Sequence, residues 1–301
     1  MHTNRQFVIA ALLTVGGLVT QLPAQERPEI EVRTVQLAEN VYMLAGAGGN
    51  LALSAGDHGA LLVDSEYAQL TEKVTAAVKE VCETPIRFVI NTHWHFDHVG
   101  GNEAFTKAGA LIVAHENVRK RMSSAQVLEP MERQVPPSPA AALPVITYAD
   151  ALTFHWNGDQ VQVIHVEPAH TDGDSLVYFR KANVLHMGDV WFNGMYPFID
   201  VNAGGSIDGM VKAAERGLAL ANDKTKIIPG HGPLSNVKEL REYRDMLATV
   251  RDRVRPMVRE GKSREEVIAA KPTKDLDEKW GRGGFGPDMW VGIVYDGMSK
   301  E

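Results

Sequence analysis

The segment at residues 91–98, which reads NTHWHFDH, holds three histidines and one aspartate within six residues. Neutral imidazole nitrogens and a carboxylate oxygen are the ligands that Zn²⁺ and similar divalent ions prefer. In an extended chain, side chains two residues apart point to the same side. His93, His95 and Asp97 are therefore expected to converge, with His98 offset toward a second centre. We interpret this segment as a metal-binding loop; the alternative is a solvated, histidine-rich turn.

Three later segments each place a ligand-type residue after a predicted strand and beside a glycine or another small residue. They are PAHTDGD with His170, MGD with Asp189, and PGHG with His231. Glycine lets the backbone turn sharply near a metal, because it has no Cβ atom. The repetition of this arrangement favours a metal site assembled from four segments and weakens the alternative of a solvated turn.

The ordered set HWHFDH, AHTDGD, GD and PGHG resembles the motifs of the metallo-β-lactamase superfamily, and Asp64 matches the first motif of that family. The resemblance extends from about residue 31 to about residue 240. It implies an α/β fold, the four-layer αββα metallo-β-lactamase sandwich. It also implies a ligand set with Asp189 as a bridge between two ions and Asp64 as the group that orients the ligand loop. The first ion would be held by His93, His95 and His170, and the second by Asp97, His98 and His231.

A site of this kind implies hydrolysis. Two divalent ions lower the pKa of a shared water, and the resulting hydroxide attacks a carbonyl or a similar centre. Asp97 is the predicted catalytic residue, because its carboxylate can orient the nucleophile and take its proton. The ions are expected to be zinc, with iron or manganese as alternatives, since mixed nitrogen and oxygen ligands suit all three.

The expected substrate is a small ester, lactone, thioester or amide, with β-lactam cleavage as a possible side activity. The motif at residues 188–189 lacks the metal-binding cysteine of the commonest β-lactamase group, and residues 190–202 contain no lysine or arginine to clamp a β-lactam carboxylate. The alternative from another class is a non-catalytic periplasmic metal-binding or accessory protein of an oxidative system.

The first 24 residues have the pattern of a secretory signal peptide. Arg5 precedes an apolar run at residues 7–20, and Ala24 ends a cleavage-like tripeptide. We expect a periplasmic or secreted hydrolase domain at residues 25–301 with no stable membrane insertion after cleavage; an uncleaved anchor is the alternative. The formal charge of −7 and the lack of a basic block argue against nucleic acid as a partner. The single cysteine, Cys82, is expected to be inert.

The predicted elements alternate between strands and helices without a linker, which favours one domain with sheets covered by helices. Residues 125–150 contain five prolines and are expected to form a long surface loop, either a flap over the site or an insertion of no consequence. Strands are expected at 31–37, 41–44, 51–54, 60–64, 86–91, 111–114, 152–156, 160–166, 175–180, 184–186 and 226–228, and helices at 69–83, 102–107, 115–123, 207–220, 237–259 and 264–271.

Several aromatic residues lie close in sequence to the predicted ligands. They either form an apolar wall beside the metals or pack the loops. These residues are Trp94, Phe96, Trp191, Phe192, Tyr196 and Phe198. The glycine-rich turn at residues 281–287 either caps the pocket or contacts a second subunit. The remaining histidines are interpreted as structural, because all seven ligand positions are already filled: His58, His115, His155, His165 and His186.

Overall fold

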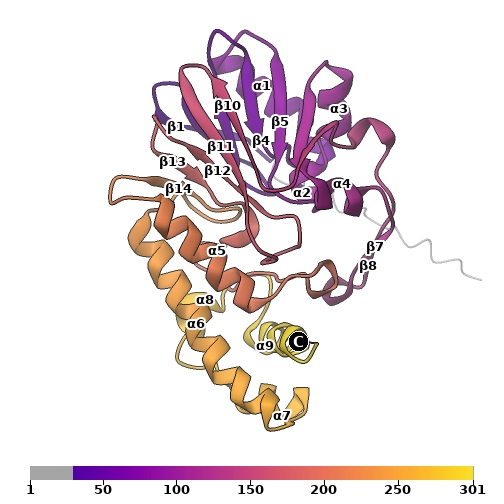
Figure 1. Cartoon of the computed structure of the whole chain (residues 1–301), viewed down its shortest axis with the longest axis vertical. Helices are drawn as coiled ribbons and strands as arrows, with labels where there is room; N and C mark the ends of the chain where they lie inside the picture. The colour runs from indigo at the N-terminus through magenta and orange to yellow at the C-terminus, as the bar shows by residue number, and fades with distance from the viewer. Residues whose placement is uncertain (1–29, 301) are drawn as a thin grey trace, which may run out of the picture. The chain divides into compact units, whose positions relative to one another are not determined.

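Two mixed β-sheets lie at the centre of the computed structural model, which describes residues 30–300 (Figure 1). The predicted signal peptide lies outside the described residues, so its boundary stays a prediction. One sheet has seven strands in the order β1-β2-β3-β4-β5-β6-β9: β1 (Arg33–Ala38), β2 (Val41–Ala45), β3 (Leu51–Ser54), β4 (Ala60–Val63), β5 (Ile86–Asn91), β6 (Leu111–His115) and β9 (Ile146–Tyr148). The other has five strands in sequence order: β10 (Ala151–Trp156), β11 (Asp159–His165), β12 (Ser175–Phe179), β13 (Val184–His186) and β14 (Lys226–Ile228).

The two sheets pack face to face because their strands are apolar on both sides. In β4, Leu61 and Val63 face the second sheet, and Leu62 faces the helical layer on the other side. In the second sheet, Val184 of β13 joins the core between the sheets, and Leu185 joins the core under the opposite helices. Alternate residues of a strand point to opposite faces, so each of these strands contributes to two cores.

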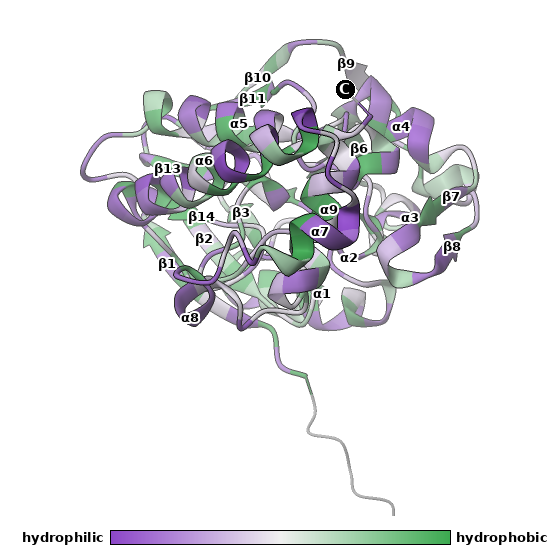
Figure 2. Ribbon diagram, turned by 90° about the horizontal axis from the view of Figure 1, so that it is seen from below, coloured by the Kyte–Doolittle hydropathy of each residue, from purple (hydrophilic) through white to green (hydrophobic). Residues whose placement is uncertain are grey.

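Helices cover the outer face of each sheet. Helix α1 (Thr71–Val81) buries Val74 and Val78 against the first sheet. On the second sheet lie α5 (Ile207–Leu220) and α6 (Val237–Arg259), and α6 buries one residue about every three or four positions. Helix α9 (Pro287–Met298) packs against these two helices and against the short helix that follows α6. Figure 2 shows hydrophilic and hydrophobic residues mixed along these helices, as expected for helices with one buried side. The order helix, sheet, sheet, helix confirms the predicted αββα sandwich.

The remaining helices are short and lie mainly on loops around the sheets. They are α2 (Phe96–Val99), α3 (Asn102–Lys107), α4 (Glu116–Met122), α7 (Arg264–Ala269) and α8 (Asp277–Trp280). The helix expected at 69–83 is α1 preceded by a 3₁₀ turn, and the strand expected at 60–64 ends at Val63. It ends there because Asp64 adopts a φ of 64°, which breaks the extended conformation. Among the described helices, none combines the length and apolarity needed to cross a bilayer.

The long surface loop expected at residues 125–150 contains regular elements that the sequence did not predict. This segment holds a two-stranded hairpin, β7 (Gln126–Leu128) paired with β8 (Arg133–Val135), and then β9, which pairs with β6 at the edge of the first sheet. The strands are only three residues long and are separated by prolines, so alternation within them is too brief to detect. The glycine-rich turn near residue 281 leads into α9, which sequence periodicity did not reveal because it is apolar on most sides.

Candidate metal centre

The loop after β5 carries His93 and His95, and then the chain turns into α2, which begins after His95. Asp97 and His98 therefore lie on one helical turn, and not on an extended strand. This corrects the expectation that His93, His95 and Asp97 converge through alternation along a strand. Asp97 and His98 fall in a different group of ligand-type atoms from His93 and His95, although the His93 and His98 rings lie side by side, with centroids 4.2 Å apart.

The three later ligand-type residues all lie on loops that leave the second sheet. His170 lies between β11 and β12, Asp189 lies on the 3₁₀ turn after β13, and His231 follows β14. Strands β13 and β14 are parallel, so the loops after them leave at the same end of the sheet. The fold brings all seven predicted residues together at this end, in two groups: His93, His95, His170 and Asp189; and Asp97, His98 and His231.

Distances between the facing atoms match those expected around a bound ion. Within the first group, His95 Nδ1 lies 2.8 Å from His170 Nε2, which lies 3.4 Å from Asp189 Oδ2. In the second group, His231 Nε2 lies 3.2 Å from Asp97 Oδ2. Ligand atoms about 2.0–2.1 Å from a tetrahedral zinc ion lie roughly 3.3 Å from one another. The ligand atoms of each group all lie within 4.8 Å of one another.

Asp189 faces both groups. Its Oδ1 lies 3.1 Å from His98 Nε2, and its Oδ2 lies 3.4 Å from the Nε2 atoms of both His170 and His231. In addition, His93 Nε2, His98 Nε2 and Asp189 Oδ1 are buried atoms without a hydrogen-bond partner among the described residues. Buried polar atoms are normally paired, so three unpaired atoms directed at one space fit a pair of metal ions.

The ligand histidines are held by hydrogen bonds from their other ring nitrogens. His98 Nδ1 lies 2.8 Å from Asp64 Oδ2, and His170 Nδ1 lies 2.7 Å from the carbonyl oxygen of Phe198. Asp64 also accepts hydrogen bonds from the backbone N–H and hydroxyl of Thr92 at 2.7 and 2.8 Å. Such partners fix the tautomer that presents a lone pair to the site. The structure thus gives Asp64 the contacts of a group that orients the ligand loop.

Two further carboxylates contact this site and were missed by sequence reasoning. Asp200 Oδ2 accepts a hydrogen bond from His95 Nε2–H at 3.0 Å, which leaves His95 Nδ1 free to face His170. Asp174 accepts hydrogen bonds from the backbone N–H groups of His170 and Thr171 at 2.7 and 2.9 Å. Asp174 belongs to the AHTDGD motif, whose second acid could have indicated it. Asp200 belongs to no motif and lies 105 residues from His95 in the chain.

The electrostatics differ between the two groups. Burial lowers the pKa of His170 to about 4 and that of His93 well below its ordinary value, so both imidazoles are held neutral. Burial opposes the charged form of His231 as well, but the carboxylates of Asp189 and Asp97 outweigh it and raise its pKa to about 9. Because metals bind neutral imidazole, an ion bound by His231 must displace a proton.

Two glycines leave room for the ligands. A Cβ atom at Gly49 would lie 2.1 Å from His98 Cε1, and one at Gly230 would lie 2.0 Å from Asp189 Oδ1. Both distances are below any real non-bonded contact. The backbone therefore approaches the ligands more closely than any residue with a side chain would allow.

A cavity of about 280 Å³ lies over the two groups, and His95, Asp97, Asp189 and His231 form its polar end. The rest of its wall is mainly apolar. It includes Phe96, Phe192, Tyr196 and Phe198, which confirms part of the expected aromatic wall. Trp94 and Trp191 do not line it: they are 3% and 0% exposed and belong to the core under the helices of the second sheet.

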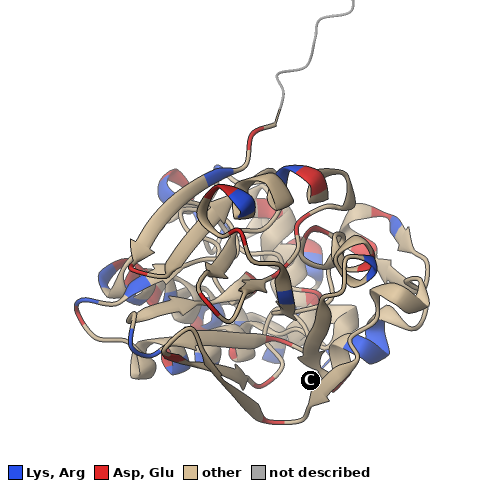
Figure 3. Ribbon diagram, turned by 90° about the horizontal axis from the view of Figure 1, so that it is seen from above, with Lys and Arg blue, Asp and Glu red and all other residues tan. Residues whose placement is uncertain are grey.

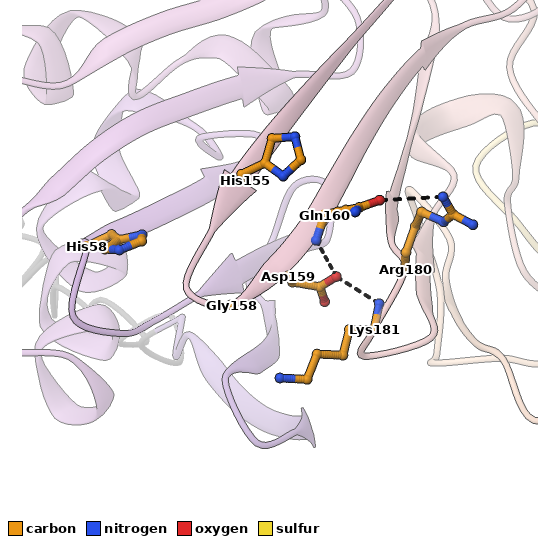
Figure 4. A pocket seen from close by; sticks show the side chains of 7 residues that line it. All are labelled: His58, His155, Gly158, Asp159, Gln160, Arg180 and Lys181. Atoms are coloured by element: carbon orange, nitrogen blue, oxygen red, sulfur yellow. Dashed lines mark hydrogen bonds between the residues drawn. The ribbon is translucent and has the colours of Figure 1, made fainter.

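A wider hollow of about 680 Å³ lies elsewhere, at the turn between β10 and β11 and the turn after β12 (Figure 4). Asp159 accepts hydrogen bonds there from the backbone N–H groups of Gln160 and Lys181, and Arg180 bonds the Gln160 side chain. Its polar groups thus bond one another, and it contains none of the clustered ligand-type residues.

The histidines interpreted as structural lie outside both groups. His115 and His165 stack at 3.7 Å between ring centroids, and His186 Nε2 lies 2.9 Å from the carbonyl oxygen of Asn50. Cys82 is buried, with its sulfur next to the Thr84 hydroxyl. These residues show contacts within the fold and no convergence with the seven.

The sequence profile of the metallo-β-lactamase superfamily matches residues 40–233. The chain belongs to this superfamily of hydrolases. It is 27% identical over 148 residues to a hydroxyacylglutathione hydrolase from Pelagibacter ubique, a match that covers 48% of this chain and 52% of that protein. It is 22% identical over 208 residues to the human acyl-coenzyme A thioesterase MBLAC2, which covers 64% of this chain and 72% of that protein.

Among solved structures, a metallo-β-lactamase from Pontibacter korlensis superimposes with a TM-score of 0.61 at 19% identity, covering 72% of this chain and 99% of that one. At 19% sequence identity, this structural similarity shows that the two proteins share a fold. The chain spans about half the length of the hydroxyacylglutathione hydrolase that it matches.

Proposed function

We propose that this chain is a dinuclear metal-dependent hydrolase that cleaves a small ester, lactone, thioester or amide. The observation that carries the proposal is the convergence of seven ligand-type side chains at the polar end of an otherwise apolar cavity. One relative is named as a hydroxyacylglutathione hydrolase and another as an acyl-coenzyme A thioesterase; both names support hydrolysis, and the second supports a thioester as one of the candidate substrates. β-Lactam cleavage stays in the range as a side activity.

The donors are five imidazoles and two carboxylates, which suit zinc first and iron or manganese as alternatives. Two such ions would acidify a shared water and polarise the carbonyl oxygen of the substrate. Asp64 and Asp200 hold His98 and His95 in the tautomers that can bind an ion. Asp189 would bridge the ions, because its carboxylate faces histidines of both groups.

Asp97 is the residue best placed to handle a proton. Its carboxylate lies in the cavity wall, 3.2 Å from His231 Nε2. Burial alone would raise its pKa, but His98 and His231 outweigh that effect and lower it, so the carboxylate stays ionised at neutral pH. An ionised carboxylate beside the reacting atoms can orient a water and accept its proton.

The test is turnover by zinc-loaded protein of a panel containing an ester, a lactone, a thioester and the β-lactam nitrocefin, with and without a chelator. Asp97→Asn should lower chelator-sensitive turnover by about 10²- to 10⁴-fold. Asp57→Asn, a change at an exposed residue, is the matched control and should keep full activity. Bound metal without turnover of any panel member would favour the non-catalytic accessory protein instead.

We also propose that the protein is exported and works in the periplasm or outside the cell on a small molecule. The support is the signal-like pattern of residues 1–24. Lys and Arg are interspersed with Asp and Glu on the face in Figure 3, which does not favour nucleic acid as a partner. N-terminal sequencing of protein recovered from the periplasm should give a mature start near residue 25; an intact Met1 would contradict cleavage.

A further inference from the structure

We propose that the cavity over the metal centre is an acyl subsite, which takes an uncharged apolar tail attached to the scissile group of the substrate. This inference rests on the proposed hydrolase function and names its substrate class. Three segments far apart in sequence contribute apolar side chains to the wall, in addition to the loop that carries Phe96. The turn between β7 and β8 supplies Met131, the stretch after Asp189 supplies Phe192 and Phe198, and the glycine-rich turn before α9 supplies Phe285.

Aromatic rings continue from the ligand histidines toward the outer wall. The Phe198 ring centroid lies 5.6 Å from that of His95 and 5.3 Å from that of Phe285, on which it stacks at an interplanar angle of 16°. On another side, Phe192 stacks on His231 with centroids 5.0 Å apart. A substrate tail leaving the metal centre would therefore meet apolar ring surface immediately and bury its methylene groups against it.

The apolar part of the cavity, beyond the ligand residues, offers no cationic side chain to an anionic tail. Among the described residues, no lysine or arginine lines it. The Tyr196 hydroxyl donates to Asp277 Oδ1 at 2.9 Å and is thus occupied. Arg133 is outside the lining, with its guanidinium carbon 3.6 Å above the centre of the Phe96 ring. A carboxylate at the end of the tail would lose water without a lysine or arginine in the lining to pair with, which is unfavourable.

Two exposed apolar residues of the hairpin β7–β8 differ in whether they line the cavity. Met131 lines the cavity although 42% of it is exposed, so a bound tail can cover it further. A methionine side chain is flexible and adapts its shape to an apolar partner. Val127 of the same hairpin is 50% exposed and does not line the cavity. It provides a matched control for loss of an exposed apolar side chain from the hairpin.

The experiment measures binding by calorimetry, so it does not depend on which bond the enzyme cleaves. The probes are straight-chain hydroxamic acids from acetohydroxamate to octanohydroxamate, whose shared head group chelates divalent ions through two oxygens, and an octanohydroxamate with a carboxylate at its far end. In zinc-loaded protein, Kd should fall about fourfold for each added methylene, as expected for burial of that group. The probe with the terminal carboxylate should bind at least about tenfold more weakly than octanohydroxamate.

Phe285→Ala and Met131→Ala should each weaken octanohydroxamate binding by about tenfold and leave acetohydroxamate within about twofold. Val127→Ala should change neither value. A Kd independent of chain length, or tighter binding of the carboxylate probe, would overturn the acyl subsite and leave the hydrolase proposal standing. Two other outcomes would overturn the proposed metal centre and the subsite with it. In the first, the protein does not load zinc; in the second, acetohydroxamate binding does not depend on zinc.

Discussion

Asp200→Asn should weaken binding of one metal ion and leave the other largely unaffected. Asp200 Oδ2 accepts the hydrogen bond from His95 Nε2–H, and both side chains are almost fully buried, at 4% and 5% exposed. Asparagine can keep its oxygen on the backbone N–H of Ala203, which Asp200 Oδ1 now accepts at 3.0 Å. Its amide NH₂ would then face His95 Nε2, donor against donor.

His95 can relieve that conflict only by moving its proton to Nδ1, the nitrogen that faces His170 Nε2 at 2.8 Å. A protonated Nδ1 cannot bind an ion, so the wrong tautomer competes with metal binding. Loss of such an outer partner typically weakens metal affinity by about 10- to 100-fold. That range corresponds to about 1.4–2.7 kcal/mol of binding free energy. Water cannot replace the lost acceptor, because the pair is buried.

The assay is zinc competition against a fluorescent chelator, which resolves the two binding steps. The matched control is Asp159→Asn, because Asp159 also accepts backbone hydrogen bonds but lies at the hollow of Figure 4, away from the ligands. The control should retain both affinities. If folded Asp200→Asn bound both ions as tightly as the parent protein, the role assigned to Asp200 in holding His95 would be refuted.

Two further predictions concern the second group of ligands and the space around it. Because carboxylates raise the pKa of His231 to about 9, a proton competes with the ion below that pH. Zinc affinity at this group should therefore fall as pH decreases from 9 to 7, by about tenfold per pH unit for each displaced proton, measured by the same competition; a flat profile would contradict this assignment. Gly49→Ala should destabilise the fold by about 1–3 kcal/mol and weaken the same ion, because its Cβ would lie 2.1 Å from the His98 ring, which Asp64 holds in place. In denaturant unfolding with zinc titration, Gly284→Ala is the control: its Cβ would have no atom within 4 Å, and equal behaviour of the two variants would contradict the packing argument.

The cluster of ligand-type side chains could be predicted from sequence because each member lies in a short motif. His170, Asp189 and His231 each follow a strand and stand beside a glycine or another small residue, a pattern that is visible without knowledge of the fold. The α/β class followed from alternating apolar segments. The hairpin β7–β8 and helix α9 were missed, because three-residue strands and an apolar helix show no clear period.

The sequence by itself determined which side chains could bind metal and, through the order of motifs, which superfamily positions them. The resemblance to that superfamily also implied how these side chains divide into two groups. Only the tertiary structure decided how the chain achieves that division, since Asp97 and His98 lie on the helical turn α2 and not on an extension of the strand before His93. It also decided that Asp200 supports His95 and that Met131 and Phe285 share one cavity wall. Such contacts join residues more than a hundred positions apart. Packing of two sheets and their loops creates them, and no local pattern in the chain encodes that proximity.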